Sequence, residues 1–258
     1  MSEEKGIDER LMKKKLKAQS IYLAKDRNFV YHKIKFKQFQ NILDVGCGSG
    51  LIIKEMARKR GEGAKITGID ISPGMIESAM KTLAGTEGIE LTVGDALALP
   101  FPDNTFDLTI CNLLLLWVKE PEKAIREMAR VTKSGGKIVA MYEPDNAGKC
   151  NYPEDKYLSQ VIEFMKRKGA DPFAGRKLRM FFAKAGVNAE IGIHPYVMPV
   201  EMMKTAHKMD REYGVKLLKE MGIPESEIEE WLNLNEDMIE KEHALWFLPA
   251  FYAIGVKK

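Results

Sequence analysis

Three glycines stand at alternate positions directly after an apolar run that ends in an acid, in the stretch ILDVGCGSG. Gly46, Gly48 and Gly50 have no Cβ, so this loop can turn sharply and let a ligand touch main-chain atoms. The dinucleotide fingerprint GxGxxG fails here, because neither possible frame places its third glycine correctly. A phosphate would favour bare backbone N–H groups, and Asp44 would repel it. The loop therefore predicts a phosphate-free ligand that carries cationic groups of its own.

Two further acids follow the next two apolar runs, and each would lie at the end of a strand. Asp70 ends KITGID about twenty residues after the glycine loop, where a carboxylate can accept both hydroxyls of a ribose. Asp95, in VGDALALPF, is placed to accept from an adenine amino group, with the backbone at Ala96 and Leu97 beside the ring. Any one of these acids alone could cap a helix or a turn. Three acids at successive strand ends after GxGxG are hard to explain as caps, so they favour a nucleoside site.

The middle of the chain repeats a short apolar run, a turn and a helical pattern. Five such runs predict strands at 40–46, 65–70, 89–95, 106–112 and 136–143. Helical segments are expected after the first three runs and between the fourth and the fifth, and two more strands within 188–198 and 243–256. Strands that are apolar on both faces are typical of parallel sheets covered by helices on both sides. We therefore predict an α/β fold with a doubly wound, seven-stranded, mostly parallel sheet.

Local signals predict helix ends and domain limits. Ser72 is expected to cap a helix whose first residue is Pro73, and Pro121 to open a helix that Gly135 or Gly136 closes. The expected divisions are a basic helical segment at 1–40, an α/β domain at 41–198, a helical insertion or lid at 199–243 and a final strand of the α/β domain at 244–258. In an open parallel sheet, ligands bind beyond the carboxyl ends of the strands, where the strand order reverses. The glycine loop is expected at that point.

Length and composition exclude several classes of protein. A chain of 258 residues can bury a full core, and it shows neither a signal-peptide pattern nor an apolar run long enough to span a bilayer. A cytoplasmic protein without a membrane span is therefore expected. Cys47, Cys111 and Cys150 lie far apart, without CxxC or His/Cys spacing, so free thiols are expected, with no disulfide framework and no metal site.

The net charge of +3 conceals a basic N-terminal segment. Residues 1–40 hold eleven Lys and Arg against five Asp and Glu. Within them, ERLMKKKLKAQSIYLAKDR predicts an amphipathic helix that has on or near one face Leu11, Met12, Leu16 and Leu23. A solvated helix packed on the domain is the favoured interpretation. The alternatives are a helix that closes over an active site and a basic arm that binds nucleic acid.

Together these motifs resemble the class I S-adenosylmethionine-dependent methyltransferases, in their small-molecule (type 11-like) branch. LDVGCGSG resembles the first motif of that family, GIDIS followed by MIESAM its ribose-binding strand and helix, GDALALPFPDNTFDL its adenine-binding loop, and VTKSGGKIVAMYEP its fifth-strand region. GADPFAGRKLRMFFAKAGV is similar to the helix before the sixth strand of this branch. The resemblance is strong from residue 39 to 145. It implies a Rossmann-like methyltransferase fold that binds S-adenosylmethionine, and it says little about the acceptor.

The resemblance also implies which residues would surround this cofactor. At its methionine end would lie Asp44, Gly46, Cys47, Gly48 and Gly50. At its ribose would lie Asp70 and Ile71, and at its adenine Asp95, Ala96 and Leu97. At its sulfonium would lie Asn112 and Leu113. Met75 would pack against the adenine, with an ordinary core position as the alternative.

The acceptor is expected to be a small molecule. Enzymes that methylate adenine amino groups or side-chain amides usually carry Asn/Asp-Pro-Pro-Tyr after the fourth strand, where this chain has CNLLLLWV. Neither Cys111 nor Cys150 has the context of a cytosine C5 nucleophile, and no RNA-binding module is visible, so no nucleic-acid partner is expected. The helical region after residue 199 would form part of the acceptor pocket. Its apolar side chains, which could line that pocket or simply pack, are Met198, Met202, Met203, Met209, Tyr196 and Tyr213.

The catalytic residue stays unassigned, because methyl transfer from a sulfonium depends mainly on alignment. His194 could deprotonate a hydroxyl acceptor, although a structural role is favoured; Tyr142, Glu143 and Asp145 have a similar claim. The sequence thus predicts a methyltransferase that acts on an O, N or C atom of a small molecule. The alternatives are an RNA methyltransferase that uses the basic segment and a noncatalytic protein that binds S-adenosylmethionine. The oligomeric state is not predicted.

Overall fold

The chain divides into two compact units. The computed structural model describes residues 20–21, 23–194 and 197–258. The α/β unit comprises Lys25–Asp145, Gly169–His194 and Pro249–Lys258. The helical unit comprises Asn146–Lys168 and Pro195–Leu248, with the described residues before Lys25. This division differs from the expected ranges, because 146–168 group with the helical unit and the stretch 244–258 is shared between the units.

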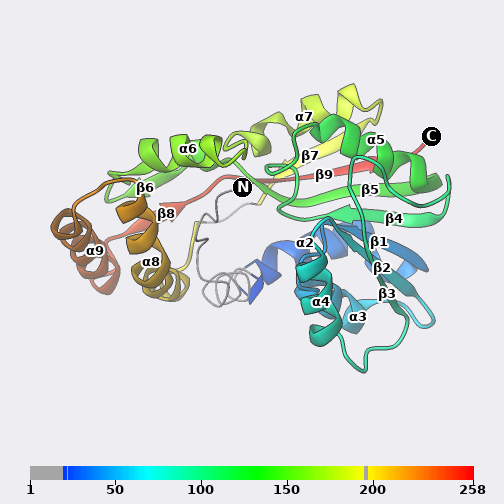
Figure 1. Ribbon diagram of the computed structural model, residues 1–258, viewed down its shortest axis with the longest axis horizontal. Coiled ribbons are helices and arrows are strands. Elements are labelled where there is room, and N and C mark those ends of the chain that lie inside the picture. Colours follow the sequence, from blue (N-terminus) through cyan, green and yellow to red (C-terminus); the bar gives the residue numbers. More distant parts are fainter. Residues whose placement is uncertain (1–19, 22, 195–196) are drawn as a thin grey trace. The chain divides into compact units, whose positions relative to one another are not determined.

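A seven-stranded sheet forms the centre of the α/β unit (Figure 1). Its strands are, in spatial order, β3 (Ile89–Val93), β2 (Lys65–Asp70), β1 (Asn41–Val45), β4 (Phe106–Cys111), β5 (Thr132–Pro144), β9 (Ala250–Val256) and β7 (Ala189–Ile193). Neighbours from β3 to β5 are parallel, and β9 is antiparallel to both β5 and β7. The predicted seven-stranded, mostly parallel sheet is therefore confirmed. The chain runs outward from β1 through β2 to β3 and returns to β4, so the strand order reverses between β1 and β4.

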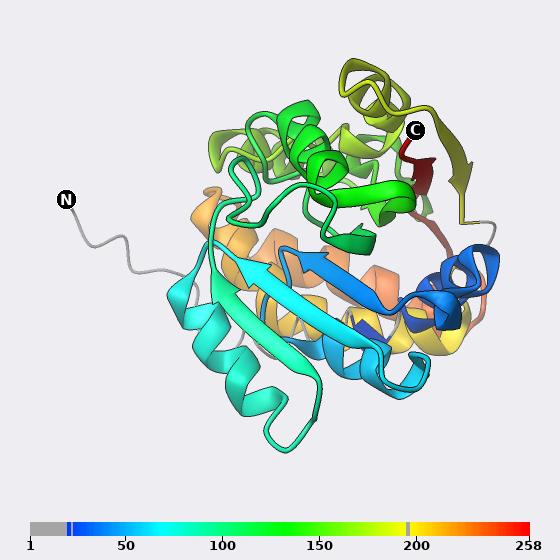
Figure 2. The same cartoon turned by 90° about the vertical axis from the view of Figure 1, so that its right-hand side faces the viewer.

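Helices cover both faces of this sheet, as predicted. On one face, Ile42, Ile66 and Ile110 of the strands share a core cluster with residues of three helices, which are α2 (Ala24–Ile34), α3 (Leu51–Lys59) and α4 (Pro73–Thr82). On the other face, Thr109 Oγ1 lies 3.5 Å from the carbonyl oxygen of Met128 in α5 (Pro121–Val131), beside which α7 (Ala174–Lys184) packs. The turned view in Figure 2 shows the parallel strands in blue and cyan side by side.

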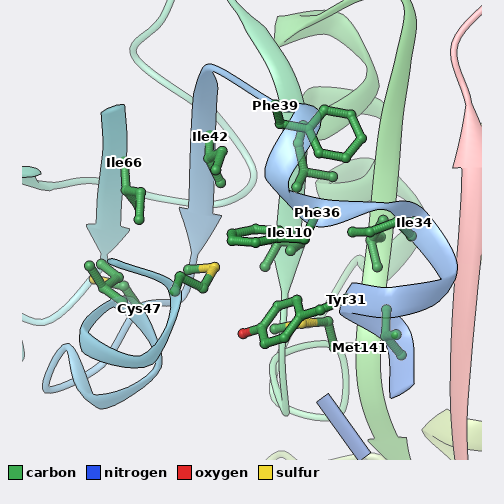
Figure 3. Close-up of a cluster of buried hydrophobic side chains, with 14 of the residues drawn as sticks. Tyr31, Ile34, Phe36, Phe39, Ile42, Cys47, Ile66, Ile110 and Met141 are labelled. Atoms are coloured by element: carbon green, nitrogen blue, oxygen red, sulfur yellow. The ribbon is translucent and has the colours of Figure 1, made fainter. Parts of the chain in front are cut away.

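The described part of the basic N-terminal segment packs on the α/β unit. Tyr31 and Ile34 of α2, with Phe36 of the short helix η1 (Phe36–Gln38), point at strand side chains such as Met141 (Figure 3). Arg27 is fully buried, and its Nε donates to Glu55 Oε2 of α3 at 3.0 Å. This packing agrees with the favoured interpretation for residues 24–34. Most of the predicted helix at 9–27, including Leu11, Met12 and Leu16, lies outside the described residues.

The sequence predictions for the segment after β3 and for the last strand are wrong. No helix follows β3, because residues 94–105 form turns before β4, in a stretch that contains Pro100 and Pro102. The predicted strand at 243–256 is two strands, β8 (Leu245–Phe247) and β9, which are separated at Pro249. Proline has no N–H for a strand ladder, so it interrupts the pairing. β8 pairs with β6 (Cys150–Tyr152) in a two-stranded sheet of the helical unit, while β9 belongs to the large sheet.

The predicted helix starts are confirmed, and one predicted end is not. Ser72 accepts a hydrogen bond from the backbone N–H of Met75 at 3.3 Å, and Pro73 is the first residue of α4. α5 begins at Pro121 as expected but ends at Val131, before the two glycines. The chain enters β5 there, and Gly135 donates its N–H to Lys257 O at 2.9 Å.

The helical unit has its own core. α6 (Leu158–Arg167), α8 (Val200–Glu220) and α9 (Glu225–Glu240) enclose Tyr157, Leu218, Ile228 and Leu232. Met203 is buried, Met198, Met202 and Met209 are half-buried, and Tyr196 and the Tyr213 side chain lie outside what is described. Among the helices that the structure describes, none is both long and apolar enough to cross a membrane.

Candidate functional site at the carboxyl ends of the strands

The glycine loop joins β1 to α3 at the point where the strand order reverses. Gly46, Gly48 and Gly50 have φ angles of 75°, 52° and 77°, which L-residues rarely adopt. A Cβ added at Gly46 would lie 2.7 Å from Leu114 Cδ1, and one at Gly50 would lie 2.9 Å from Leu83 Cδ1. A Cβ at Gly48 would meet nothing within 4 Å. The outer glycines are therefore needed for packing, whereas Gly48 presents bare backbone to open space.

Asp70, at the end of β2, holds this loop in place. Its Oδ2 accepts from the N–H of Gly48 at 2.9 Å, and its Oδ1 accepts from the N–H of Ser72 at 2.9 Å. Each carboxylate oxygen can accept more than one hydrogen bond, so both keep capacity for a further donor. Asp70 is only partly buried, which leaves that capacity accessible.

Asp44, at the end of β1, is a buried carboxylate with unused acceptor capacity. Only 1% of the residue is exposed, and its Oδ2 has no hydrogen-bond donor among the described residues. Burial, reinforced by the negative charge of Asp70, raises the pKa of Asp44 to about 7, and the charge of Arg27 opposes this rise. A cation beside Asp44 would supply a donor for Oδ2 and a counter-charge in addition to that of Arg27.

The expected adenine and ribose residues lie on exposed or half-exposed surface. Ile71 is 69% exposed, and Met75, Ala96 and Leu97 are half-buried. Asp95 is exposed, two residues beyond β3, and its Oδ1 accepts from the N–H of Leu97 at 2.9 Å. The structure thus brings together the first two acids and the loop, and leaves the third acid in a separate turn of the same sheet edge.

Cys47 differs from the other loop residues because its side chain is part of the core. Only 6% of it is exposed, and its Sγ lies 3.0 Å from where a Cβ on Gly68 would stand. Burial raises the pKa of its thiol, so the group stays protonated. Only the backbone of Cys47 is available to a ligand at this loop.

The turn after β4 is strained and is held by a buried carboxylate of β5. Leu113 has φ 56° and donates its N–H to Tyr142 O at 3.0 Å. Glu143 is fully buried, and its Oε1 accepts from the N–H of Leu114 at 3.0 Å. Burial raises the pKa of Glu143 to about 7, although backbone N–H groups of residues 114–116 favour the ionised form. The sequence had marked Glu143 only as one candidate base, and nothing local indicated that it holds this turn.

His194 has a structural environment. Its Nε2 lies 2.9 Å from Met141 O, its Nδ1 lies 3.3 Å from Asp26 Oδ1, and only 4% of the residue is exposed. The ring stacks on Tyr142 with centroids 5.4 Å apart. Because both ring nitrogens face protein oxygens, the geometry favours the structural interpretation. Asp145, another candidate base, is buried and pairs with Arg176.

The sequence did not single out two residues that lie near Asp44. Arg27 and Tyr31 of α2 both interact electrostatically with that carboxylate. They belong to a segment rich in Lys and Arg, and no local pattern distinguishes buried Arg27 from exposed cations such as Lys25 and Lys37 among the residues described there. Within the described part of the chain, no three His, Cys, Asp or Glu side chains gather as metal ligands.

Sequence comparisons match the part of the chain that carries this site. Residues 43–140 match the family model described as a methyltransferase domain. An uncharacterized methyltransferase of Schizosaccharomyces pombe is 33% identical over 165 residues, which are 60% of this chain and 59% of that protein. The demethylmenaquinone methyltransferase of Desulfitobacterium hafniense is 38% identical over 111 residues, 42% of this chain and 44% of that protein. The matches thus span about half the length of these curated relatives.

A solved structure has the same fold. The phosphoethanolamine N-methyltransferase 2 of Haemonchus contortus, in complex with phosphomonomethylethanolamine and S-adenosylhomocysteine, superposes with a TM-score of 0.61 and 15% identity. The superposition covers 91% of this chain and 53% of that one. At 15% sequence identity, this similarity shows a shared fold and nothing more specific.

Proposed function

Because residues 43–140 belong to the methyltransferase-domain family and the α/β unit has the class I fold of that family, we propose that this protein transfers a methyl group from S-adenosylmethionine to a nucleophilic O, N or C atom of a small molecule. The observation that carries this proposal is the buried, donor-free oxygen of Asp44 beside a glycine loop whose middle residue faces open space. A phosphate-free nucleoside with a cationic end fits this combination of charge and shape.

Each residue of the sheet edge has a role in this proposal. Asp44 and the backbone of the glycine loop hold the cationic amino-acid end of the cofactor, and Asp70 with Ile71 holds the ribose. Asp95 and the backbone at Ala96 and Leu97 border the adenine, against which Met75 packs. Asn112 and Leu113, at the strained turn after β4, border the sulfonium. Support comes from the placement of these residues along the carboxyl edge of β1 to β4.

The chain's contribution to the reaction is alignment. S-adenosylmethionine, when bound, supplies a methyl group on a positively charged sulfur that a nucleophile can take by in-line displacement. Asp44 and Asp70 fix the cofactor at its amino-acid end and at its ribose, and the turn at Leu113 positions the residues beside the methyl group. Positioning of this kind can lower a barrier by roughly 7–11 kcal/mol, so a dedicated base is optional.

Substitution of Gly48 should separate ligand binding from folding. In Gly48→Ala, the methyl group would enter the open space in which we place the cofactor, while the left-handed backbone costs about 1 kcal/mol of folding free energy. We expect the affinity for S-adenosylmethionine to fall by about tenfold or more, which is about 1.4 kcal/mol or more. Gly85→Ala is the matched control, because Gly85 has φ 76° and an equally open Cβ position in the turn between α4 and β3. Equal calorimetric affinities in the two variants would contradict the placement.

The acceptor class can be tested with methyl-labelled S-adenosylmethionine. The labelled cofactor is incubated with the protein and with separate metabolite and RNA fractions of a cell extract. Label is expected in the metabolite fraction. Label in RNA, lost steeply as salt is raised, would instead indicate a nucleic-acid methyltransferase that uses the basic segment. Tight binding of the cofactor without transfer to any fraction would indicate a noncatalytic protein.

A further inference from the structure

A cavity opens at the amino ends of the strands, on the edge of the sheet opposite to the proposed cofactor site. Its lining comes from within residues 33–39, which end α2 and form η1, from Asp107 near the start of β4, and from residues 133–137 at the start of β5. β1, β4 and β5 are parallel, so the starts of β4 and β5 lie away from the glycine loop. All lining residues belong to the α/β unit. The volume of about 610 Å³ is within the range of roughly 300–1,000 Å³ that is typical of small-molecule sites.

The charge of this cavity is mainly positive. Its charged side chains, among the described residues, are Lys33, Lys35, Lys133, Lys137 and Asp107. The Asp107 carboxylate is already compensated, because Lys133 Nζ lies 2.6 Å from its Oδ1. Lys33 Nζ lies 2.8 Å from Oε1 of Glu190 on β7, in a partly exposed pair that contributes little. Neither pair removes the charge of the other two lysines.

Lys35 and Lys137 supply the positive charge that is not compensated. Within the described part of the chain, no carboxylate forms an ion pair with either of them. Lys137 lies two residues before Val139 in a regular stretch of β5, so its side chain projects from the same face as the core cluster that contains Val139. Ile34 and Phe39 of the same cluster also line the cavity (Figure 3). The two cations therefore share a cavity whose apolar lining is part of the packed core.

The start of β5 adds a hydroxyl group and bare backbone to the lining. Ser134 is exposed, and its hydroxyl donates to the carbonyl oxygen of Lys258 at 3.3 Å, which is long for an O–H···O hydrogen bond. A ligand can therefore take over this donor at low cost. Gly135 has φ 78°, and a Cβ added there would meet nothing within 4 Å. A ligand oxygen can approach this backbone closely.

The donors of the cavity fit a compact dianion. A phosphate monoester carries about −1.5 to −2 charges at neutral pH on one group that has three strong acceptor oxygens. The cavity offers two uncompensated ammonium groups and one hydroxyl, so each of these oxygens can have a donor. A cation would be repelled by the lysines, and a neutral ligand would gain nothing from their charge.

We propose that this cavity binds the phosphate group of a small phosphorylated molecule, with Lys35, Lys137 and the Ser134 hydroxyl as donors. The volume suits a small molecule rather than a chain of nucleotides. S-adenosylmethionine and the methyl acceptor are placed at the opposite edge of the sheet, so the phosphate site is a second site. Its test does not require methyl transfer, and its failure would leave the proposed function standing.

Nuclear magnetic resonance of the full chain, labelled with nitrogen-15, measures this binding with inorganic phosphate as the probe. At about pH 8 the probe is a dianion. We expect saturable shifts of backbone signals from residues 33–39 and 133–137, with a dissociation constant on the order of 1 mM. Shifts that do not saturate, or that spread over lysines elsewhere, would overturn the proposal. Succinate is a dianion without phosphorus, and binding of succinate as tight as that of phosphate would overturn the assignment of the ligand class.

The variants Lys35→Gln and Lys137→Gln test the two donors. Each removes one uncompensated charge from the cavity, so we expect the dissociation constant for phosphate to rise about fivefold in each. Lys123→Gln is the matched control, because Lys123 is an exposed lysine on α5 that does not line the cavity, and its affinity should equal that of the wild type. Equal weakening in all three variants would indicate general attraction to a basic surface and would overturn the proposal. If Lys137→Gln does not fold, the exposed Lys35 and the wild-type shifts decide.

Discussion

Replacement of Asp70 by alanine is expected to weaken binding of S-adenosylmethionine by about 100-fold or more while the protein still folds. In the proposed site, the carboxylate accepts both ribose hydroxyls, and each hydrogen bond to a charged acceptor contributes about 1.5–3 kcal/mol. Asp70 also accepts from the N–H groups of Gly48 and Ser72, so the variant frees the glycine loop as well. Both effects act on the cofactor site and neither removes core packing.

Isothermal titration calorimetry measures the affinity of Asp70→Ala for the cofactor, and circular dichroism shows whether the variant is folded. Asp103→Ala is a suitable control, because Asp103 is an exposed carboxylate of the same unit whose side chain pairs with Arg130 at 2.8 Å. We expect the control to bind the cofactor like the wild type. An unchanged dissociation constant in Asp70→Ala would show that the ribose assignment is wrong, and a loss of the circular dichroism signal would show that Asp70 mainly supports the fold.

Cofactor affinity is expected to depend on pH through Asp44. The pKa of this carboxyl is raised to about 7 by burial and by the charge of Asp70, against the opposing charge of Arg27, and it interacts also with Tyr31 and Cys47. A cationic cofactor requires the ionised form. Affinity should therefore be constant above about pH 8 and fall about tenfold per unit below about pH 6, with protons released on binding in that lower range.

Asp44→Asn should remove this pH dependence and lower the affinity at about pH 8 to that of the protonated wild type. The same variant should be more stable than the wild type. A carboxyl whose pKa is raised in the folded state stabilises the fold fully below its unfolded pKa of about 3.9, and this contribution is lost as the pH rises through about 7. Removal of the charge should therefore raise the unfolding free energy at about pH 8 by a few kcal/mol. A dissociation constant that stays flat across this pH range in the wild type would contradict the role of Asp44.

Much of the α/β unit could be predicted from the sequence because its signals are local. Strands that are buried on both faces appear in the sequence as continuous apolar runs. The helix cap at Ser72, followed directly by Pro73, is also a pattern of neighbouring residues. The prediction failed where one apolar run contains two strands that belong to different sheets. Leu245–Phe247 and Ala250–Val256 read as a single strand, but Pro249 interrupts the ladder and the two halves join different sheets.

The site was predictable only where strand ends bear a recognisable pattern. Asp44, Asp70 and the glycine loop follow apolar runs and occupy the expected sheet edge, although their contacts with a cofactor remain predictions. The positions of Arg27 and Glu143 in the fold could not be predicted, because each forms a hydrogen bond with a residue that is distant in the sequence. Arg27 meets Glu55, and Glu143 meets the backbone of Leu114. Such pairings depend on how the strands and helices pack, which no local pattern reveals.

In the proposed site, the carboxyl edge of β1 to β4 holds a phosphate-free, cationic nucleoside. A crystal soaked with S-adenosylhomocysteine and NAD together tests it most directly. We expect electron density for the nucleoside, with its ribose on Asp70 and its amino group beside Asp44. Empty strand ends, or NAD in that position, would contradict it.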